Sequence, residues 1–282
     1  MKEYLFICDS GCDISESLMS NIPVIRVPIT LTIQNQIFID DGRLDLNSFL
    51  SEMKASPVSP KSSAPSPALF IQHFNKAEKI FIVTISKQIS STYNNAILAK
   101  KLYHETNPDK FIEVIDTKGA SVCGSLVVNY LHNLLQLNTP ALEAVKLTRQ
   151  HVDNLNTLFV IDDLSNLKKS GRLSHLSSVV ASVLKIKPLF GADNGNIVMR
   201  EKIRGYRKAL DRMLAKIGET ASLNNINFEN RILGVAYCKA ADVAKQFVQK
   251  ATDLYNFKDS IIVEMKPTIS VFANIKGILI SY

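Results

Sequence analysis

The segment Phe159–Ser174 reads FVIDDLSNLKKSGRLS and contains an arginine in a setting that could bind an anion. Its apolar start predicts a strand and Ser170-Gly171 predicts a turn, so Arg172 is expected just beyond the carboxyl end of a strand. A guanidinium held there can bind a carboxylate or a phosphate through two parallel hydrogen bonds. From the spacing alone, the alternative is a structural ion pair with Asp162 or Asp163.

Serine-rich turns could supply hydroxyl groups to the same anion. Hydroxyl and turn N–H groups at strand ends form a good cradle for a carboxylate or a phosphate. The alternative is purely local, because serine and threonine favour turns and helix N-caps for their own backbone. The candidate hydroxyl groups belong to Ser62, Ser63, Ser86, Ser90, Ser91, Thr92 and Ser121.

A serine hydrolase with Ser62 or Ser90 as its nucleophile is an alternative from a different class of protein. It needs a histidine close to the nucleophile, oriented by a carboxylate. Of the five histidines, only His175 follows a turn of interest, and the others are expected in helices or at helix ends. The chain has no G-x-S-x-G elbow and no G-x-x-x-x-G-K-[ST] or G-x-G-x-x-G phosphate loop, which argues against nucleotide enzymes.

Strand-like and helix-like segments alternate in the first part of the chain, which is typical of a parallel sheet. In such sheets ligands gather at the carboxyl ends of the strands, where several of the serine turns fall. The proline- and serine-rich residues 56–67 resemble a linker in composition, but a loop at that place can also line a site. Strands are expected at Tyr4–Cys8, Pro23–Thr32, Lys79–Ile85, Phe111–Asp116 and Thr157–Ile161, and a hairpin or loop at Gln34–Leu44 with its turn at Asp40–Gly42.

The pattern changes beyond Arg172. Val179–Leu184 is expected to end a helix, and Asp193-Asn194-Gly195 predicts the turn of a hairpin. Later segments predict helices at Arg204–Ile217 and Ala240–Leu254 and strands at Ile232–Tyr237, Ser260–Met265 and Gly277–Ser281. We therefore predict an α/β fold, with an N-terminal domain over residues 1–161 that has a mainly parallel sheet flanked by helices. A smaller C-terminal α+β domain with a mixed sheet is predicted over residues 162–282.

Composition excludes several classes of protein. The chain has 282 residues, 46% of them hydrophobic, which is enough for a core. Its net charge of +7 is spread along the sequence without a basic stripe interleaved with aromatic residues, so no nucleic acid is expected as a partner. No apolar run approaches the roughly 18 residues of a membrane span, and no signal peptide is recognisable. We expect a cytoplasmic protein whose four cysteines are buried free thiols and not zinc ligands.

Several short segments match the motifs of one known protein family, in the same order, over essentially the whole chain. The order and spacing of the motifs are specific, although each motif alone is weak. CDSGCDI at Cys8–Ile14 looks like D-S-x-x-D-[LI], SSAPSP at Ser62–Pro67 is similar to T-S-Q-P-S, and ISKQISSTYNNA at Ile85–Ala96 resembles I-S-S-x-L-S-G-T-Y-x-S-A. IDDLSNLKKSGRLS at Ile161–Ser174 matches V-D-D-L-x-x-L-x-K-G-G-R-I-S, and IRGYRKAL at Ile203–Leu210 is close to R-G-x-x-K-A-L. Taken in order, these motifs resemble the DegV family of bacterial fatty-acid-binding proteins.

The resemblance implies a lipid-binding protein that is not an enzyme and needs no cofactor. One long-chain fatty acid would lie between the two domains, covered by the C-terminal domain, with its carboxylate held by Ser62 and Ser90 of the first. The protein would act as an acyl carrier or as a substrate-presenting subunit for a fatty acid kinase. In kinase-linked members, the arginine that corresponds to Arg172 lies near the head group. The full set expected to bind the ligand is Ser62, Ser63, Ser90, Ser91, Thr92, Arg172 and Phe272.

Two departures from the family motifs bear on this expectation. The family's H-x-G-P-G aligns with KPTISVFANIKG so that its histidine falls on Phe272 and its glycines on Asn274 and Lys276. The glycine of S-G-T-Y is replaced by Ser91. Loss of the histidine leaves acid binding in place and argues against support for phosphoryl transfer. Loss of the glycines predicts a different backbone there, because glycine adopts dihedral angles that other residues avoid.

Overall fold

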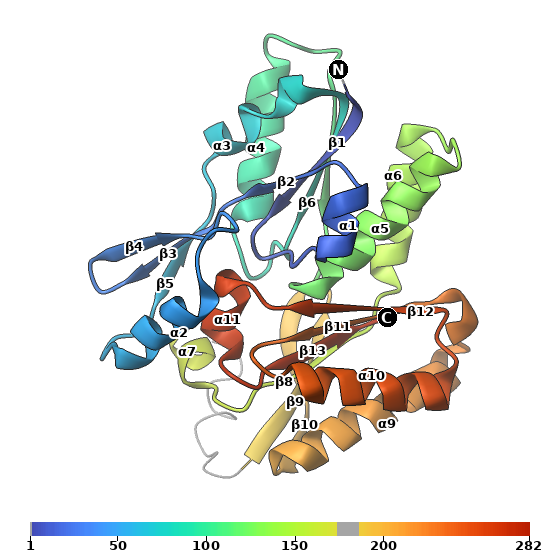
Figure 1. The fold of residues 1–282 in the computed structure, drawn as a ribbon. Helices are drawn as coiled ribbons and strands as arrows, with labels where there is room; N and C mark the ends of the chain where they lie inside the picture. The colour runs from blue at the N-terminus through green and yellow to red at the C-terminus, as the bar shows by residue number, and fades with distance from the viewer. Residues whose placement is uncertain (1, 174–185) are drawn as a thin grey trace.

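The computed structural model describes residues 2–173 and 186–282, whose strands form three sheets (Figure 1). A four-stranded sheet forms the centre of the first lobe and a six-stranded sheet that of the second lobe. The predicted helix end Val179–Leu184 lies outside the described residues. The first lobe, with a small three-stranded sheet beside it, contains β1 (Lys2–Asp9), α1 (Glu16–Asn21), β2 (Val24–Val27), β3 (Thr30–Ile33), β4 (Gln36–Ile39), α2 (Leu46–Ala55), β5 (Lys61–Ser63), α3 (Pro67–Ile71), η1 (Phe74–Lys76), β6 (Ala77–Thr84), α4 (Thr92–His104), β7 (Phe111–Asp116), α5 (Val122–Gln136) and α6 (Ala141–Asp153).

The sheet of the first lobe is entirely parallel, in the order β2-β1-β6-β7. Successive side chains of β1 face opposite ways, so Leu5 and Ile7 pack with residues of α3 and α4. Phe6 and Cys8 pack on the other face with residues of α5 and α6. A parallel sheet covered on both faces buries both sides of its strands, which is why they read as continuous apolar runs. The predicted parallel sheet flanked by helices is confirmed.

Residues 23–67 fold differently from the prediction, because a small antiparallel sheet forms within them. The predicted strand Pro23–Thr32 is wrong as a single element, because the chain leaves β2 at Pro28 and β3 then pairs antiparallel with β4 and β5. Proline has no N–H to donate to a ladder. The β3–β4 hairpin turns at Gln34-Asn35 and not at Asp40–Gly42. Ser62 lies on β5, opposite Leu31, so the proline- and serine-rich segment is held by a sheet.

The six-stranded sheet of the second lobe is mixed, in the order β10-β9-β8-β13-β11-β12. Leu158 and Val160 face one side, in a cluster with residues of α9 and α10. Phe159 faces the other side, where it shares a cluster with Leu50 of α2 and Ile269 of α11. The lobes therefore meet at this second face. The elements of the second lobe are β8 (Thr157–Val160), α7 (Ser165–Lys169), β9 (Ile186–Asp193), β10 (Asn196–Arg204), α9 (Tyr206–Asn224), η3 (Phe228–Asn230), β11 (Ile232–Tyr237), α10 (Ala241–Tyr255), β12 (Asp259–Glu264), α11 (Pro267–Ala273) and β13 (Ile278–Ser281).

The strand predicted at Thr157–Ile161 does not belong to the first lobe. As β8 it pairs antiparallel with β13 and β9 of the second sheet. The two sheets therefore part before Thr157, although residues 1–161 are predicted as the first domain. A central strand of either sheet is a short apolar run, so its pattern alone cannot assign it to one of them. The division into separate domains stays a prediction.

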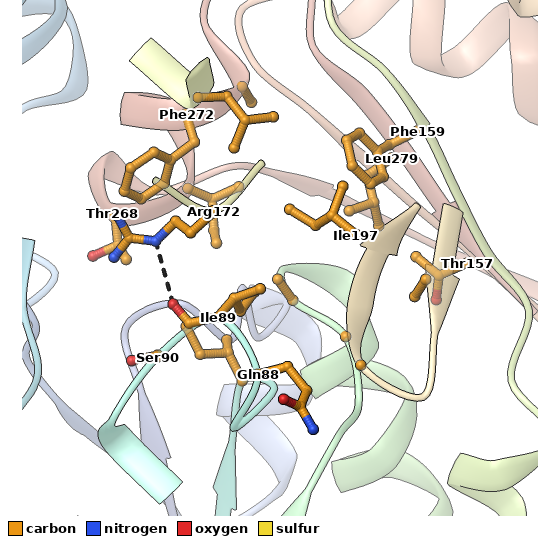
Figure 2. Close-up of a pocket in the computed structure, with 18 of the residues that line it drawn as sticks. Gln88, Ile89, Ser90, Thr157, Phe159, Arg172, Ile197, Thr268, Phe272 and Leu279 are labelled. Atoms are coloured by element: carbon orange, nitrogen blue, oxygen red, sulfur yellow. Dashed lines mark hydrogen bonds between the residues drawn. The ribbon is translucent and has the colours of Figure 1, made fainter. Parts of the chain in front are cut away.

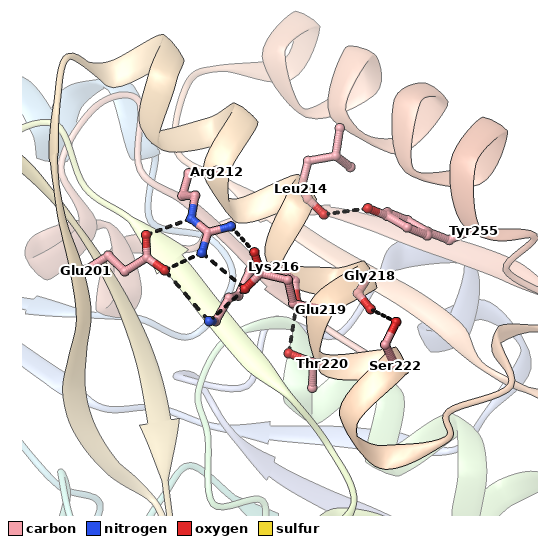
Figure 3. A network of polar contacts seen from close by, with 9 residues as sticks. All are labelled: Glu201, Arg212, Leu214, Lys216, Gly218, Glu219, Thr220, Ser222 and Tyr255. Atoms are coloured by element: carbon pink, nitrogen blue, oxygen red, sulfur yellow. Dashed lines mark hydrogen bonds and ion pairs between the residues drawn. The ribbon is translucent and has the colours of Figure 1, made fainter.

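Charged residues fix α9 to the outer strand of the second sheet (Figure 3). Arg212 of α9 donates to both carboxylate oxygens of Glu201 on β10, at 2.7 and 2.6 Å. Glu219, further along the same helix, accepts from Arg212 and from Lys216. The hydroxyl of Tyr255 on α10 donates to the Leu214 carbonyl at 3.0 Å, which ties the two covering helices together. Each partly exposed ion pair contributes little to stability by itself, but several pairs joined in a network contribute more.

The predicted hairpin turn at Asp193–Gly195 is confirmed. It joins β9 to β10, and its central residues Asn194 and Gly195 have φ values of 47° and 84°. A two-residue hairpin loop with positive φ at both positions is a type I′ turn, whose twist matches that of the flanking strands. Asparagine and glycine tolerate positive φ, which explains the Asn-Gly sequence. The Gly195 carbonyl accepts a hydrogen bond from the Ser86 hydroxyl at 2.8 Å. This turn of the second lobe is therefore docked on the first.

We expect Gly195→Ala to destabilise the protein by about 2–4 kcal/mol, because it adds both backbone strain and a steric overlap. A β-carbon at Gly195 would overlap the Ser86 hydroxyl. Gly171 has a φ of 78°, close to the 84° of Gly195, and a β-carbon there would meet no atom within 4 Å. Gly171→Ala is therefore the matched control with strain alone, at a cost of about 1–2 kcal/mol. Urea unfolding measures both free energies, and equal losses would contradict a docked turn.

Candidate functional site

A cavity of about 390 Å³ lies between the two lobes. Its volume falls within the range of about 300–1,000 Å³ that is usual for small-molecule sites. The first lobe contributes the turn after β6, with Gln88 and Ile89, and the second contributes Phe159 of β8 and Leu279 of β13 (Figure 2). Helix α11 supplies Phe272. Because both lobes form the wall, the cavity exists only when they are assembled.

The cavity has a polar end and an apolar end (Figure 2). Arg172 and Ser90 lie at the polar end, near the turn after β6. Phe159, Ile197 and Leu279 gather on the opposite side, where their side chains offer only carbon. This arrangement suits a ligand with one polar head and a long apolar tail.

Arg172 brings a positive charge to the polar end, and acceptors from both lobes hold its guanidinium. Its Nε–H donates to the Ile89 carbonyl at 3.2 Å, and an Nη2–H donates to the Ser62 hydroxyl at 3.0 Å. Nη1 donates to the Ser170 carbonyl at 3.3 Å. Burial lowers the pKa of the Arg172 guanidinium from its usual value. This lowering reflects the cost of taking a charge out of water.

The alternative of a structural ion pair for Arg172 is wrong. Asp162 pairs with Lys187 at 2.7 Å, and an Asp163 carboxylate oxygen accepts from the Ser165 backbone N–H at 2.9 Å. Within residues 2–173 and 186–282, no carboxylate forms an ion pair with Arg172. The guanidinium thus reaches the cavity without a counter-charge from the described chain.

Phe272 meets Arg172 through its ring, where the family's histidine could form a hydrogen bond. The guanidinium carbon lies 4.6 Å from the centre of the phenyl ring, which is a cation–π contact. Asn274 and Lys276, where the family motif has glycines, have φ values of 53° and 68°. The backbone there keeps the conformation that favours glycine, contrary to the change of backbone that the sequence predicts. Ser91, at the third glycine position, has an ordinary φ of −76°.

The structure brings most of the predicted site residues together, but not all. Ser62, Ser90, Ser91, Arg172 and Phe272 line the cavity. Ser63 does not, because successive residues of β5 face opposite ways and its side chain is exposed. Thr92 is buried behind Ser90, whose hydroxyl lies 2.8 Å from that of Thr92.

Sequence reasoning missed α11, which lines the cavity with Thr268, Ile269 and Ala273 as well as Phe272. The helix has seven residues, too few for a helical period to stand out. Its signal is Pro267, because proline favours the first position of a helix. The carboxylates that bond to its start, Asp13 and Asp40, are more than 200 residues away in the chain.

The described histidines give no support to a catalytic triad. None of His73, His104, His132 and His151 lines the cavity. His151 stacks on Tyr130 in a different part of the molecule, and burial lowers its pKa to about 4. His175 lies outside the described residues. All four cysteines are buried and free, as predicted.

The structure is that of a two-lobed α/β protein with a cavity between its lobes. A family model described as "Uncharacterised protein, DegV family" matches residues 5–282. The chain therefore belongs to the DegV family, and the resemblance of the motifs is confirmed. A DegV domain-containing protein of Streptococcus pyogenes serotype M1 is 30% identical over 281 residues, which cover 98% of each of the two chains.

Solved structures of the family are similar over the full length. A DegV family protein from Ruminococcus gnavus, described with vaccenic acid, has a TM-score of 0.94 at 29% identity, covering 100% of this chain and 99% of its own. The Fatty Acid Kinase (Fak) B3 protein of Streptococcus pneumoniae, loaded with linoleic acid, has a TM-score of 0.89 at 28% identity, covering 99% of each chain. In the part of this chain that the structure describes, no helix has both the length and the apolar composition needed to cross a membrane.

We expect Asp13→Asn to remove part of the pH dependence of stability. Burial raises the pKa of Asp13 to about 7, above the value near 4 of an unfolded chain. The folded state then binds more protons between about pH 4 and 7, so this group makes the free energy of unfolding fall as the pH rises through that window. Asparagine can still accept from the Lys266 N–H and donate to the Ser121 hydroxyl. Urea unfolding from pH 4.5 to 8 should show a shallower fall in the variant, and identical slopes would contradict it.

Proposed function

We propose that this chain binds one long-chain fatty acid between its lobes, with the carboxylate against Arg172, Ser62 and Ser90. The observation that carries the proposal is the half-buried Arg172 guanidinium, which has no ion pair among the described residues. A buried charge without a counter-charge is costly, so an anionic head group is its natural partner. The fatty acids in the Ruminococcus gnavus and Streptococcus pneumoniae structures support the same interpretation.

Hydrogen-bond accounting at the polar end supports a carboxylate. A guanidinium has five N–H donors, and three in Arg172 go to acceptors among the described residues. Ser62 accepts from Arg172, so its own hydroxyl hydrogen can be donated to a ligand. Hydrogen bonds to a charged carboxylate are roughly twice as strong as neutral ones.

The apolar end supports selection for a long chain. Each buried CH₂ group contributes about 0.8 kcal/mol, so a long acyl chain gains far more than a short one from the same head-group contacts. Phe159, Ile161, Ile269 and Leu279 present carbon to that chain. Short carboxylic acids would therefore bind weakly despite the favourable head-group site.

We further propose a non-catalytic role, as an acyl carrier or as a substrate-presenting subunit for a fatty acid kinase. The similarity to the Streptococcus pneumoniae Fak B3 protein supports the second role. Phe272 supports the first, because a phenyl ring neither donates a hydrogen bond nor transfers a proton. The carrier role is therefore the better supported of the two for this chain. A cytoplasmic location stays a prediction.

Mass spectrometry of lipid extracted from natively purified protein tests the proposal directly. We expect a long-chain fatty acid in the extract, and its complete absence from protein purified with lipid present would contradict the function. A serine-reactive fluorophosphonate probe tests the alternative of a serine hydrolase that acts on lipid esters. Labelling of Ser62 or Ser90 would favour that enzyme over a carrier.

We expect Arg172→Met to lower the affinity for a long-chain fatty acid about 10- to 100-fold, because charged hydrogen bonds are lost. The affinity for the fatty alcohol of the same length should hardly change, since an alcohol has no charge to pair. Lys169→Met is the matched control, because it removes an exposed charge outside the cavity. Calorimetric titration measures both ligands. An equal loss for acid and alcohol would refute a charge-pairing role.

We expect Ser90→Ala to weaken acid binding by about 1–3 kcal/mol, the usual cost of losing a hydrogen bond to a charged group. Ser63→Ala removes the same hydroxyl from an exposed position outside the cavity and should have no effect. A titration with one fatty acid compares the two variants. Unchanged affinity in Ser90→Ala would remove that residue from the site.

A further inference from the structure

Buried carboxyl groups near the cavity have no part in the proposed ligand contacts. Asp13 and Asp40 are both almost completely inaccessible, at 1% and 0% exposure. Neither lines the cavity. Both belong to the first lobe, yet both accept hydrogen bonds from the start of α11 in the second lobe. Burying a carboxyl group costs free energy, so we asked what the hydrogen bonds of these two groups across the lobe boundary achieve.

The bonds of Asp40 are concentrated on one residue of α11. Its Oδ2 accepts from the Thr268 backbone N–H at 2.9 Å and from the Thr268 hydroxyl at 2.6 Å. The Thr268 hydroxyl oxygen lies 2.9 Å from that of Ser10, which in turn accepts from the Ile29 N–H at 2.9 Å. The other oxygen, Oδ1, has no hydrogen-bond partner among the described residues. The desolvation of this carboxyl is therefore offset mainly by its hold on Thr268.

Helix α11 depends on these caps. It has seven residues, and its N-cap residue, Lys266, forms no side-chain cap of its own. Isolated helices of this length are unstable, and N-terminal N–H groups need acceptors. Asp13 accepts from the Lys266 N–H at 2.9 Å and Asp40 from that of Thr268. The first lobe thus fixes where α11 begins.

The same helix places a ring on the head-group arginine. Thr268 and Phe272 are four residues apart, so they lie on one face of α11. Thr268 is fixed by Asp40, and Phe272 stacks on the Arg172 guanidinium at 4.6 Å. Both residues line the cavity. A shift of α11 would therefore move the ring that limits where the guanidinium can lie.

We propose that Asp40 is a positioning residue for the head-group site, acting through Thr268 and Phe272 on Arg172. It does not touch the ligand. It sets the first turn of α11, and with it the ring that holds the guanidinium in place for the carboxylate. This inference rests on the proposed function, because it assumes that Arg172 pairs with an acid.

The test compares a long-chain fatty acid with the fatty alcohol of the same length, because only the acid uses the Arg172 charge. We expect Asp40→Ala, which changes no residue of the cavity wall, to reduce the preference for the acid about tenfold with alcohol affinity unchanged. Phe272→Leu should reduce the ratio of acid to alcohol affinity by a similar factor. Asp40→Asn keeps an oxygen acceptor for Thr268 and should retain most of the preference. Asp41→Ala is the control, because Asp41 lies next in the chain but pairs with the exposed Arg43.

A double variant separates a positioning role from a merely structural one. If Asp40 acts through the ring, Asp40→Ala should cost no further acid preference in a Phe272→Leu background, because residues that act through one another are not additive. Full additivity would overturn the inference, as would an equal loss of acid and alcohol affinity. Thr268→Val, which keeps the side-chain shape but removes the hydroxyl, decides in the same way if circular dichroism shows that Asp40→Ala is unfolded.

The outcomes for the two proposals can be told apart. A wild-type protein that binds acid and alcohol equally well would sink the proposed function, and the inference with it. The inference alone would be contradicted if the wild-type protein prefers the acid and a folded Asp40→Ala variant keeps that preference in full.

Discussion

The Arg172 guanidinium can be placed only by both lobes at once. The first lobe offers it the Ile89 carbonyl and the Ser62 hydroxyl, and the second offers the Ser170 carbonyl and the Phe272 ring. A cation half withdrawn from water is stable only where acceptors and an aromatic face surround it. The packing of the two sheets, the short strand β5 and the turn after β6 all serve to bring these groups to one point.

Polar contacts between the lobes make that placement specific. Ser10 meets Thr268 across 258 residues of chain, and Ser86 meets the Gly195 carbonyl across 109. A buried polar group that misses its partner loses free energy, whereas apolar surfaces can slide with little change. The apolar face of the second sheet therefore provides attraction between the lobes, and the hydroxyl and carboxyl groups determine a single relative position.

The sequence predicts what depends on local pattern and on motif order. Apolar runs predict the parallel strands, Asn194-Gly195 predicts a hairpin turn, and the ordered motifs predict the family. It does not predict which sheet takes up Thr157–Val160, because an apolar run fits either one. Nor does it separate Ser62 from Ser63, since only the strand at residues 61–63 makes neighbouring side chains face opposite ways. It does not predict helix α11, because seven residues are too few to show a helical period and the caps come from distant residues.

Because both lobes form the wall of the cavity, a ligand bound there stabilises the folded protein as a whole. A compound that binds only the assembled form adds RT ln(1 + [L]/Kd) to the free energy of unfolding, about 2.7 kcal/mol at a concentration one hundred times Kd. The melting temperature of this protein should therefore depend on how much lipid each preparation retains. Samples with and without bound lipid differ in stability. Their melting temperatures can therefore be compared only when the lipid content of each sample is known.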